Sequence, residues 1–268
     1  MQRNAIIGAA LIAACLCLPT LARADDKPAE PTYALHTKLL DASVSVDASL
    51  KRFPGFYENL LADGKRQVAK WQAEAEKDKK EYPEIFRDNR RQEYERSYGE
   101  SSVVATRYVS VVRIDYLDGG GAHPNHKTDT ILWDAKAKRR ISIRPFFKET
   151  ADNGPTLSAL AKAIRAALAV EKRERDIQVA DPETDHDLSA VKPKLLAIGA
   201  LELAPSTAEG KSSGLFAHFS PYAVGPYAEG SYMVFVPWTA FRAYLSPEGT
   251  AIFGGERPKD DEKRDEKG

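Results

Sequence analysis

The stretch Leu117-Asp118-Gly119-Gly120-Gly121-Ala122-His123-Pro124-Asn125 organises the chain, because strand-like sequence both enters it and leaves it. Three consecutive glycines accommodate positive φ angles and close approach of other backbone. Pro124 fixes its own φ and favours an extended conformation for His123. The stretch therefore predicts a hairpin connection between two antiparallel strands. A sharper hypothesis is a shaped loop that presents His123 and Asn125 at one end of a sheet.

The sequence on both sides of this loop predicts β-strands. Val103 to Tyr116 carries apolar and β-branched residues on both of its alternating faces, which is typical of a central strand covered on both sides. Thr128 to Asp134 predicts a second strand, and Arg140 to Ile143 a third after a short turn. Farther along the chain, Leu215 to Phe219 and Tyr232 to Val236 predict two more strands, joined by a loop rich in Pro, Tyr and Gly.

Helical periodicity appears between the strands. After a strand-like segment from Tyr33 to Leu50, apolar residues recur every three or four positions from Phe56 to Ala75, and Pro83 suits the start of a second helix reaching Tyr94. Gly154-Pro155 opens another helix with a clear apolar stripe. Leu195 to Leu203 is ambiguous between strand and helix, and Trp238 to Leu245 fits a closing helical turn. The pattern predicts an α+β fold, an antiparallel sheet with helices packed on it.

The first residues have the pattern of an export signal. Arg3 supplies a basic start, Ala5 to Leu18 an apolar run, and Ala22-Arg23-Ala24 a small-residue cleavage site. We expect cleavage after Ala24 and a periplasmic or secreted protein. Lipidation of Cys15, in the run Ile12-Ala13-Ala14-Cys15, is the alternative. Cleavage after Ala24 removes both cysteines, which leaves the mature chain without a disulfide, a thiolate nucleophile or a cysteine metal site.

These observations divide the chain into four segments. Residues 1–24 form the signal peptide, 25–100 an N-terminal part of strand and helices, 101–250 an α+β domain, and 256–268 a charged tail expected to be disordered. Lys plus Arg and Asp plus Glu both number 39, so the net charge provides no attraction for nucleic acid. The only long apolar run is the export signal, too short for a transmembrane segment.

Motifs for catalysis or for a cofactor are missing from the sequence. The glycines at 119–121 precede a strand and therefore offer no helix N-terminus to a phosphate. His123 and His126 have a metal-like spacing, but Pro124 lies between them and a loop does not bring such a pair onto one face. We expect no catalytic residue, no cofactor and no metal.

The better functional candidates are Tyr222 and Tyr227, in a loop stiffened by Pro and Gly, which suits a binding surface. The alternative is that these rings only cover the end of the sheet.

Two sets of residues resemble the RsiV/PdaC-like extracytoplasmic domain family, a domain of unknown function. The first is Gly120-Gly121-Ala122-His123-Pro124, followed by the Asp134-x-Lys136 turn and Pro145-Phe146-Phe147. The second is the loop from Phe219 to Gly230, which includes Pro226, with the final Val236-Pro237-Trp238. Together they cover about Val103 to Leu245. The chain departs from the family at Ala137 and Lys138, where Thr and Gly are usual, so Lys138 is expected in a left-handed conformation.

The resemblance implies an exported, non-enzymatic binding domain of the cell envelope. The family occurs in the lysozyme-sensing anti-sigma factor RsiV and beside the deacetylase domain of PdaC, so the implied partner is a lysozyme-like muramidase or peptidoglycan. On this basis we predict binding residues Tyr222, Tyr227, His123 and Asn125, supported by the structural residues Gly120, Gly121, Ala122, Pro124, Pro226 and Gly230. The alternative function is a peptidoglycan-modifying hydrolase with a non-standard site near His123.

Overall fold

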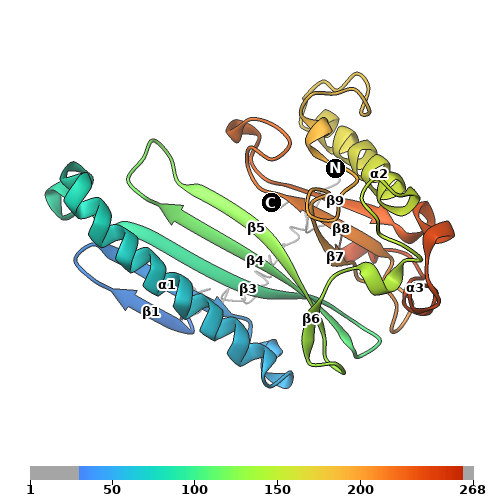
Figure 1. The fold of residues 1–268 in the computed structure, drawn as a ribbon, viewed down its shortest axis with the longest axis horizontal. Helices are drawn as coiled ribbons and strands as arrows, with labels where there is room; N and C mark the ends of the chain where they lie inside the picture. Colours follow the sequence, from blue (N-terminus) through green and yellow to red (C-terminus); the bar gives the residue numbers. More distant parts are fainter. Residues whose placement is uncertain (1–29, 262–268) are drawn as a thin grey trace, which may run out of the picture. The chain divides into compact units, whose positions relative to one another are not determined.

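The computed structural model describes residues 30–261, and within these residues the chain from Pro31 forms one compact unit (Figure 1). The predicted signal peptide lies outside the described residues. The strands are β1 (Tyr33–His36), β2 (Leu40–Val46), β3 (Gln92–Val104), β4 (Tyr108–Asp118), β5 (Asn125–Asp134), β6 (Arg139–Ile141), β7 (Ala200–Leu203), β8 (Gly214–Phe219) and β9 (Tyr232–Pro237). The α-helices of the described chain are α1 (Phe56–Glu81), α2 (Pro155–Glu174) and α3 (Pro247–Ile252).

Two sheets carry these strands, which confirms the predicted α+β class. The larger sheet has the order β1-β2-β3-β4-β5-β6, and the smaller has the order β7-β8-β9. All neighbouring strands are antiparallel except β2 and β3, which are parallel and connected through α1. The larger sheet therefore departs from the predicted antiparallel arrangement at this one pair. A parallel pair requires a crossover of a dozen or more residues, and α1 provides it.

The predicted strand from Val103 to Tyr116 is in fact the end of one strand and the start of the next. The chain reverses between β3 and β4, where Ala105 and Thr106 have φ angles of 51° and 53°. Such a turn usually contains Asn or Gly, so the sequence carried no signal for it. The predicted boundary between residues 100 and 101 falls inside β3.

The segment predicted as a second helix reaching Tyr94 also differs. Only Pro83–Asn89 is helical, as irregular 3-10 turns, and β3 already begins at Gln92. Tyr94, Arg96 and Tyr98 alternate with more exposed residues and are buried, a period of two that belongs to a strand. The alternation was not recognisable from the sequence, because the buried positions include the polar residues Gln92 and Arg96.

Hydrophobic cores lie on both faces of the larger sheet, as the apolar residues on both faces of the central strand predicted. Helix α1 packs on one face over β1, β2 and β3, with Leu60, Val68 and Ala75 buried (Figure 1). Val109 and Val111 of β4 belong to this core. The neighbouring Tyr108 points to the other face and joins the core of α2 and the smaller sheet.

The end of the segment from Leu195 to Leu203, which the sequence left ambiguous, forms strand β7. Hydroxyl groups of the larger sheet form hydrogen bonds with backbone groups along the edge of β7 that has no strand neighbour. Ser102 donates a hydrogen bond to the carbonyl of Leu203, whose own N–H donates to Ser110 Oγ. Thr130 donates to the carbonyl of Leu201 at 2.8 Å. An unpaired strand edge buried without partners would be costly, so these hydroxyls stabilise the contact between the sheets.

The charged C-terminal tail was expected to be disordered from residue 256, and the structure corrects its first part. The Arg257 guanidinium lies over the rings of Phe216 and Phe235, and Asp261 is buried and ion-paired with Arg257. Residues 262–268 lie outside the described chain. Trp238 to Leu245, predicted as a helical turn, forms two short 3-10 turns.

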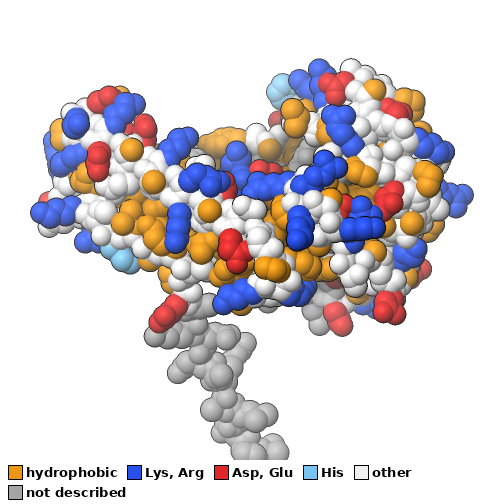
Figure 2. All heavy atoms as spheres, turned by 60° about the horizontal axis from the view of Figure 1, so that its bottom comes forward, with side chains coloured by type: hydrophobic (Ala, Val, Ile, Leu, Met, Phe, Trp, Pro, Cys, Tyr) orange, Lys and Arg blue, Asp and Glu red, His pale blue; other side chains and the backbone are white. Residues whose placement is uncertain are grey.

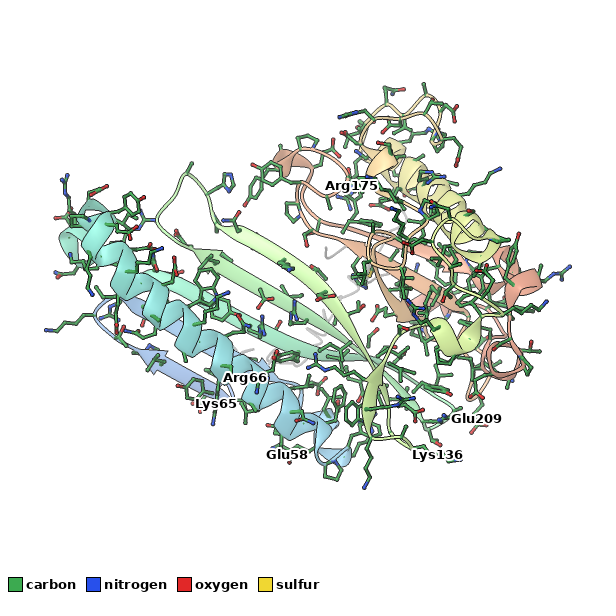
Figure 3. All side chains as sticks on the ribbon, in the orientation of Figure 1. Glu58, Lys65, Arg66, Lys136, Arg175 and Glu209 are labelled. Atoms are coloured by element: carbon green, nitrogen blue, oxygen red, sulfur yellow. The ribbon has the colours of Figure 1, made fainter. Side chains whose placement is uncertain are left out.

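Charged side chains of both signs are distributed over the protein surface. Acidic and basic groups are intermixed with apolar ones on the face shown in Figure 2. Glu58, Lys65 and Arg66 extend from α1 (Figure 3). No helix among residues 30–261 is long and apolar enough to cross a membrane.

Candidate functional site

The glycine loop connects β4 to β5 as a hairpin, as predicted. Gly120 has a φ of 87°, and its N–H donates to the Asp118 carboxylate at 2.8 Å. A Cβ at Gly120 would lie 2.5 Å from Ile85 Cγ2, in the 3-10 segment that follows α1. A Cβ at Gly121 would meet no atom within 4 Å, and the φ of Gly121 is not left-handed. Of these two residues, only Gly120 therefore requires glycine on structural grounds.

Changing Gly120 to alanine should lower the free energy of unfolding by about 1 kcal/mol or more, because both the left-handed φ and the contact with Ile85 oppose a Cβ. Gly121→Ala is the matched control and should leave the melting temperature close to that of the wild type. Thermal melting of the two variants side by side tests the assignment. Equal melting temperatures would show that the loop does not have this conformation.

The second predicted loop is held in a defined conformation by its own residues. Pro226 has a φ of −64° and precedes the 3-10 turn Tyr227–Glu229, and Gly230 ends that turn with a φ of 74°. Tyr222 has a φ of 70°, which is uncommon for a bulky residue, and its side chain is 62% exposed. The strained backbone thus holds a large aromatic side chain in solvent, an arrangement often found at functional positions.

Helix α2 anchors this loop through buried charges. Lys172 is only 2% exposed, and its Nζ lies 2.7 Å from Glu229 Oε2, which also accepts a hydrogen bond from the Tyr232 hydroxyl. Arg175 lies at the end of α2 (Figure 3). It donates to the carbonyls of Glu229 and Ser231. Burial alone would raise the pKa of Glu229, but the bonds from Lys172 and Tyr232 and the charge of Arg175 lower it below its usual value.

The two loops meet although about a hundred residues separate them in sequence. The His123 ring stacks on Tyr227 with centroids 3.9 Å apart, and the Tyr222 hydroxyl lies 3.3 Å from His123 Nε2. The Tyr227 hydroxyl donates to the carbonyl of Pro124 at 2.7 Å. We call His123, Tyr222 and Tyr227 the aromatic cluster. It brings together three of the four predicted binding residues.

The fourth predicted binding residue, Asn125, lies elsewhere, in the lining of a cavity beside α1. His126 is also separate from His123, since its ring packs edge-on against Tyr116 with centroids 5.2 Å apart. Ala122 is exposed, and Pro124 contributes its carbonyl to the contact with Tyr227. Residues 30–261 contain no group of three His, Cys, Asp or Glu side chains that could hold a metal ion.

A second candidate site, which the sequence analysis missed, is a groove between α1 and the sheet. Asp63, Gln67 and Trp71 follow each other at intervals of four residues and so form one row on α1. Opposite them, the sheet contributes three further rows of residues paired across the strands. These rows are Tyr94–Leu117–Asn125, Arg96–Asp115–Lys127 and Tyr98–Arg113–Asp129. Most of these residues, together with His126 and Arg140, line a cavity of about 480 Å³.

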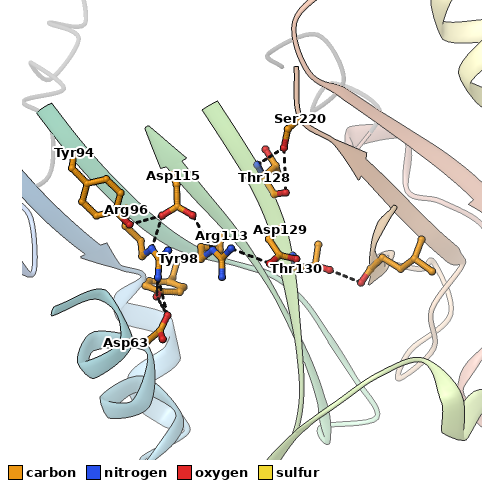
Figure 4. Close-up of polar contacts among 11 residues, drawn as sticks. Asp63, Tyr94, Arg96, Tyr98, Arg113, Asp115, Thr128, Asp129, Thr130 and Ser220 are labelled. Carbon is orange, nitrogen blue, oxygen red and sulfur yellow. Dashed lines mark hydrogen bonds and ion pairs between the residues drawn. The ribbon is translucent and has the colours of Figure 1, made fainter. Parts of the chain in front are cut away.

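Ion pairs connect the residues of this groove (Figure 4). Arg96, only 6% exposed, binds Asp115 at 2.5 Å and Asp63 at 2.8 Å. Arg113 bridges Asp115 and Asp129 at 3.0 and 2.9 Å. Burial alone would raise the pKa of Asp63, but a hydrogen bond from Tyr98 and the charges of Arg96 and Arg140 lower it below the usual 3.8. The alternation Arg113-x-Asp115 within an apolar strand was the only sequence signal for this network.

Comparison with known proteins shows a similarity of fold. No protein-family model matches the chain, and no curated protein matches it. A crystal structure of a DUF3298 family protein from Pseudomonas aeruginosa PAO1 is similar with a TM-score of 0.50 and 13% identity, over 80% of this chain and 87% of that one. A member of the same family from Bacteroides fragilis NCTC 9343 has a TM-score of 0.50 and 15% identity, over 77% and 84%. RsiV/PdaC-like domains are related to this family, so the resemblance is supported at the level of fold.

Proposed function

We propose that the chain is an exported, non-enzymatic binding domain of the cell envelope, and that the aromatic cluster is its contact surface. The observation that carries this proposal is the meeting of two distant loops around three aromatic rings, of which those of His123 and Tyr222 are exposed. Rigid aromatic side chains lose little conformational entropy on binding and are enriched at interfaces. The similarity in fold to DUF3298 family proteins is compatible with this role.

The partner that we propose is a lysozyme-like muramidase, with peptidoglycan as the second candidate. Removal of residues 1–24 leaves 37 basic and 39 acidic residues, a slightly acidic chain that suits a basic enzyme such as lysozyme. Binding of the purified mature protein to immobilised lysozyme and to insoluble peptidoglycan tests the two candidates in parallel. If the protein bound neither lysozyme nor peptidoglycan, the proposal would be refuted.

The alternative is a hydrolase with a site near His123. In the structure, His123 Nδ1 lies 3.0 Å from the carbonyl of Pro124, and Nε2 lies near the Tyr222 hydroxyl. These contacts orient the ring as part of a surface, which favours the binding role. A peptidoglycan hydrolysis assay on the same protein, with and without added zinc, distinguishes the two functions. If the wild-type protein hydrolysed peptidoglycan and His123→Ala did not, the protein would be a hydrolase and the proposed binding role would be wrong.

Export is part of the proposal and has its own test. The mature protein should begin at Asp25, because the small residues at Ala22 and Ala24 follow the end of an apolar run. Mass spectrometry of the N-terminal peptide, from protein expressed with the full sequence in a Gram-negative host, measures the cleavage site. A lipid-modified Cys15 or an uncleaved N-terminus would contradict the expected processing.

A further inference from the structure

We propose that the groove between α1 and strands β3 to β6 binds a carboxylate-bearing saccharide. This site is separate from the aromatic cluster, and the proposal does not rest on the proposed function. The cavity has a volume of about 480 Å³, within the usual range for small-ligand sites. Three features of its lining point to such a ligand: an excess of positive charge, an aromatic wall, and polar groups for hydroxyls.

Positive charge exceeds negative charge in the groove. Its lining includes Arg96, Arg113, Lys127 and Arg140, against Asp63 and Asp115. Arg96 and Arg113 already neutralise those two carboxylates. Lys127 and Arg140 form no direct ion pair within the described chain 30–261. The charge of Arg140 acts on Asp63 without direct contact, so both cations can still pair with an anion. Guanidinium and ammonium groups are the usual partners of a carboxylate.

The two engaged arginines also retain donors. Arg96 uses Nε and Nη1 for its bonds, and Arg113 uses Nε and Nη2. Nη2 of Arg96 and Nη1 of Arg113 donate to no residue within 30–261. Because the ion pairs hold both guanidiniums in place, little conformational entropy is lost when a ligand accepts hydrogen bonds from them.

The aromatic wall and the amides suit a sugar ring. Trp71 is partly exposed and packs against the buried Tyr94 with ring centroids 5.6 Å apart. Its ring offers an apolar surface to the C–H face of a sugar. Gln67 and Asn125 line the same cavity, and both donate and accept hydrogen bonds. A ligand with single carboxylates and many hydroxyls uses all of these groups, whereas a polyphosphate uses only the positive charges and has no C–H face to place against Trp71.

Isothermal titration calorimetry with a matched pair of oligosaccharides tests the proposal. The acidic probe is a hyaluronan hexasaccharide, in which glucuronate alternates with N-acetylglucosamine, and the neutral probe is chitohexaose. The acidic probe should bind at least about tenfold more tightly, because a hydrogen bond to a charged group contributes about that factor. Inorganic phosphate serves as a simple anion and should compete only weakly.

Variants locate the binding. Lys127→Gln combined with Arg140→Gln should weaken hyaluronan binding by about tenfold or more, since both charges are exposed and unpaired within the described chain. The control, Lys162→Gln combined with Lys192→Gln, removes two exposed charges elsewhere and should change nothing. Tyr222→Ala should also leave this binding intact, which separates the groove from the aromatic cluster.

Any of four results would overturn the proposal. The first two are equal binding of the two oligosaccharides and no binding of either. The third is an unchanged affinity in the Lys127→Gln, Arg140→Gln variant, and the fourth is competition by phosphate as strong as that of the acidic oligosaccharide. The last result would assign the groove to small anions in general.

Discussion

Replacing Arg96 by methionine should lower the free energy of unfolding by about 3–5 kcal/mol, because it removes the buried cation that Asp63 and Asp115 share in a poorly solvated place. Each carboxylate then keeps only its outer arginine, Arg66 for Asp63 and Arg113 for Asp115. Arg96 is 6% exposed and binds both Asp63 and Asp115. It also lies against the Tyr98 hydroxyl at 3.2 Å. Methionine is an unbranched, apolar side chain that fills much of the same space, so the loss reports the charge rather than a cavity. Urea denaturation of the purified variant measures it.

Arg66→Met is the matched control for this experiment. Arg66 pairs with the same carboxylate, Asp63, but its side chain is 69% exposed. Exposed ion pairs contribute at most about 1 kcal/mol, so this variant should unfold close to the wild type. If Arg96→Met were as stable as Arg66→Met, the groove would not contain a buried ion-pair network.

The second large effect is expected at Lys172. Lys172→Met removes the buried ammonium group that neutralises Glu229, and should also cost about 3–5 kcal/mol. The loop from Tyr222 to Gly230 loses one of its anchors to α2, so binding by the aromatic cluster should weaken although its three residues are unchanged. Both denaturation and binding are therefore measured on this variant.

Lys162→Met is the control on the same helix, where the side chain is exposed. It should preserve both stability and binding, because no ion pair within residues 30–261 depends on it. Wild-type stability in Lys172→Met would mean that the loop is held by other contacts. Lost stability with unchanged binding would mean that the aromatic cluster does not need this anchor.

The sequence predicted those parts of the fold whose periodicity is local. The apolar stripes of α1 and α2, the hairpin at Gly119–Gly121 and the left-handed Lys138, with a φ of 52°, are all present in the structure. The turn at Ala105 and Thr106 was not predictable, because neither residue is typical of a left-handed turn. The start of β3 was not predicted because two of its buried residues, Gln92 and Arg96, are polar, so the apolar alternation typical of a strand is interrupted there.

The candidate site was predictable only in part, for a similar reason. The composition of the Tyr222–Gly230 loop indicated a binding surface, and the family resemblance pointed to both loops. Neither indicated that His123 would stack on Tyr227, since this contact depends on how the two sheets pack. The groove depends on strand register, which places Arg96 opposite Asp115 and Asp115 opposite Lys127. Register between distant strands is a property of the tertiary structure.

The affinity of Tyr222→Ala for lysozyme, measured beside that of Tyr82→Ala, tests most directly whether the aromatic cluster is the contact surface. Both tyrosines are exposed, at 62% and 51%, but Tyr82 lies at the end of α1, outside the aromatic cluster. Aromatic residues at the centre of an interface commonly contribute about 2 kcal/mol or more, so Tyr222→Ala should bind about 30-fold more weakly than the wild type. Tyr82→Ala should bind like the wild type. Equal affinities for the two variants would contradict the claim that the aromatic cluster is the contact surface.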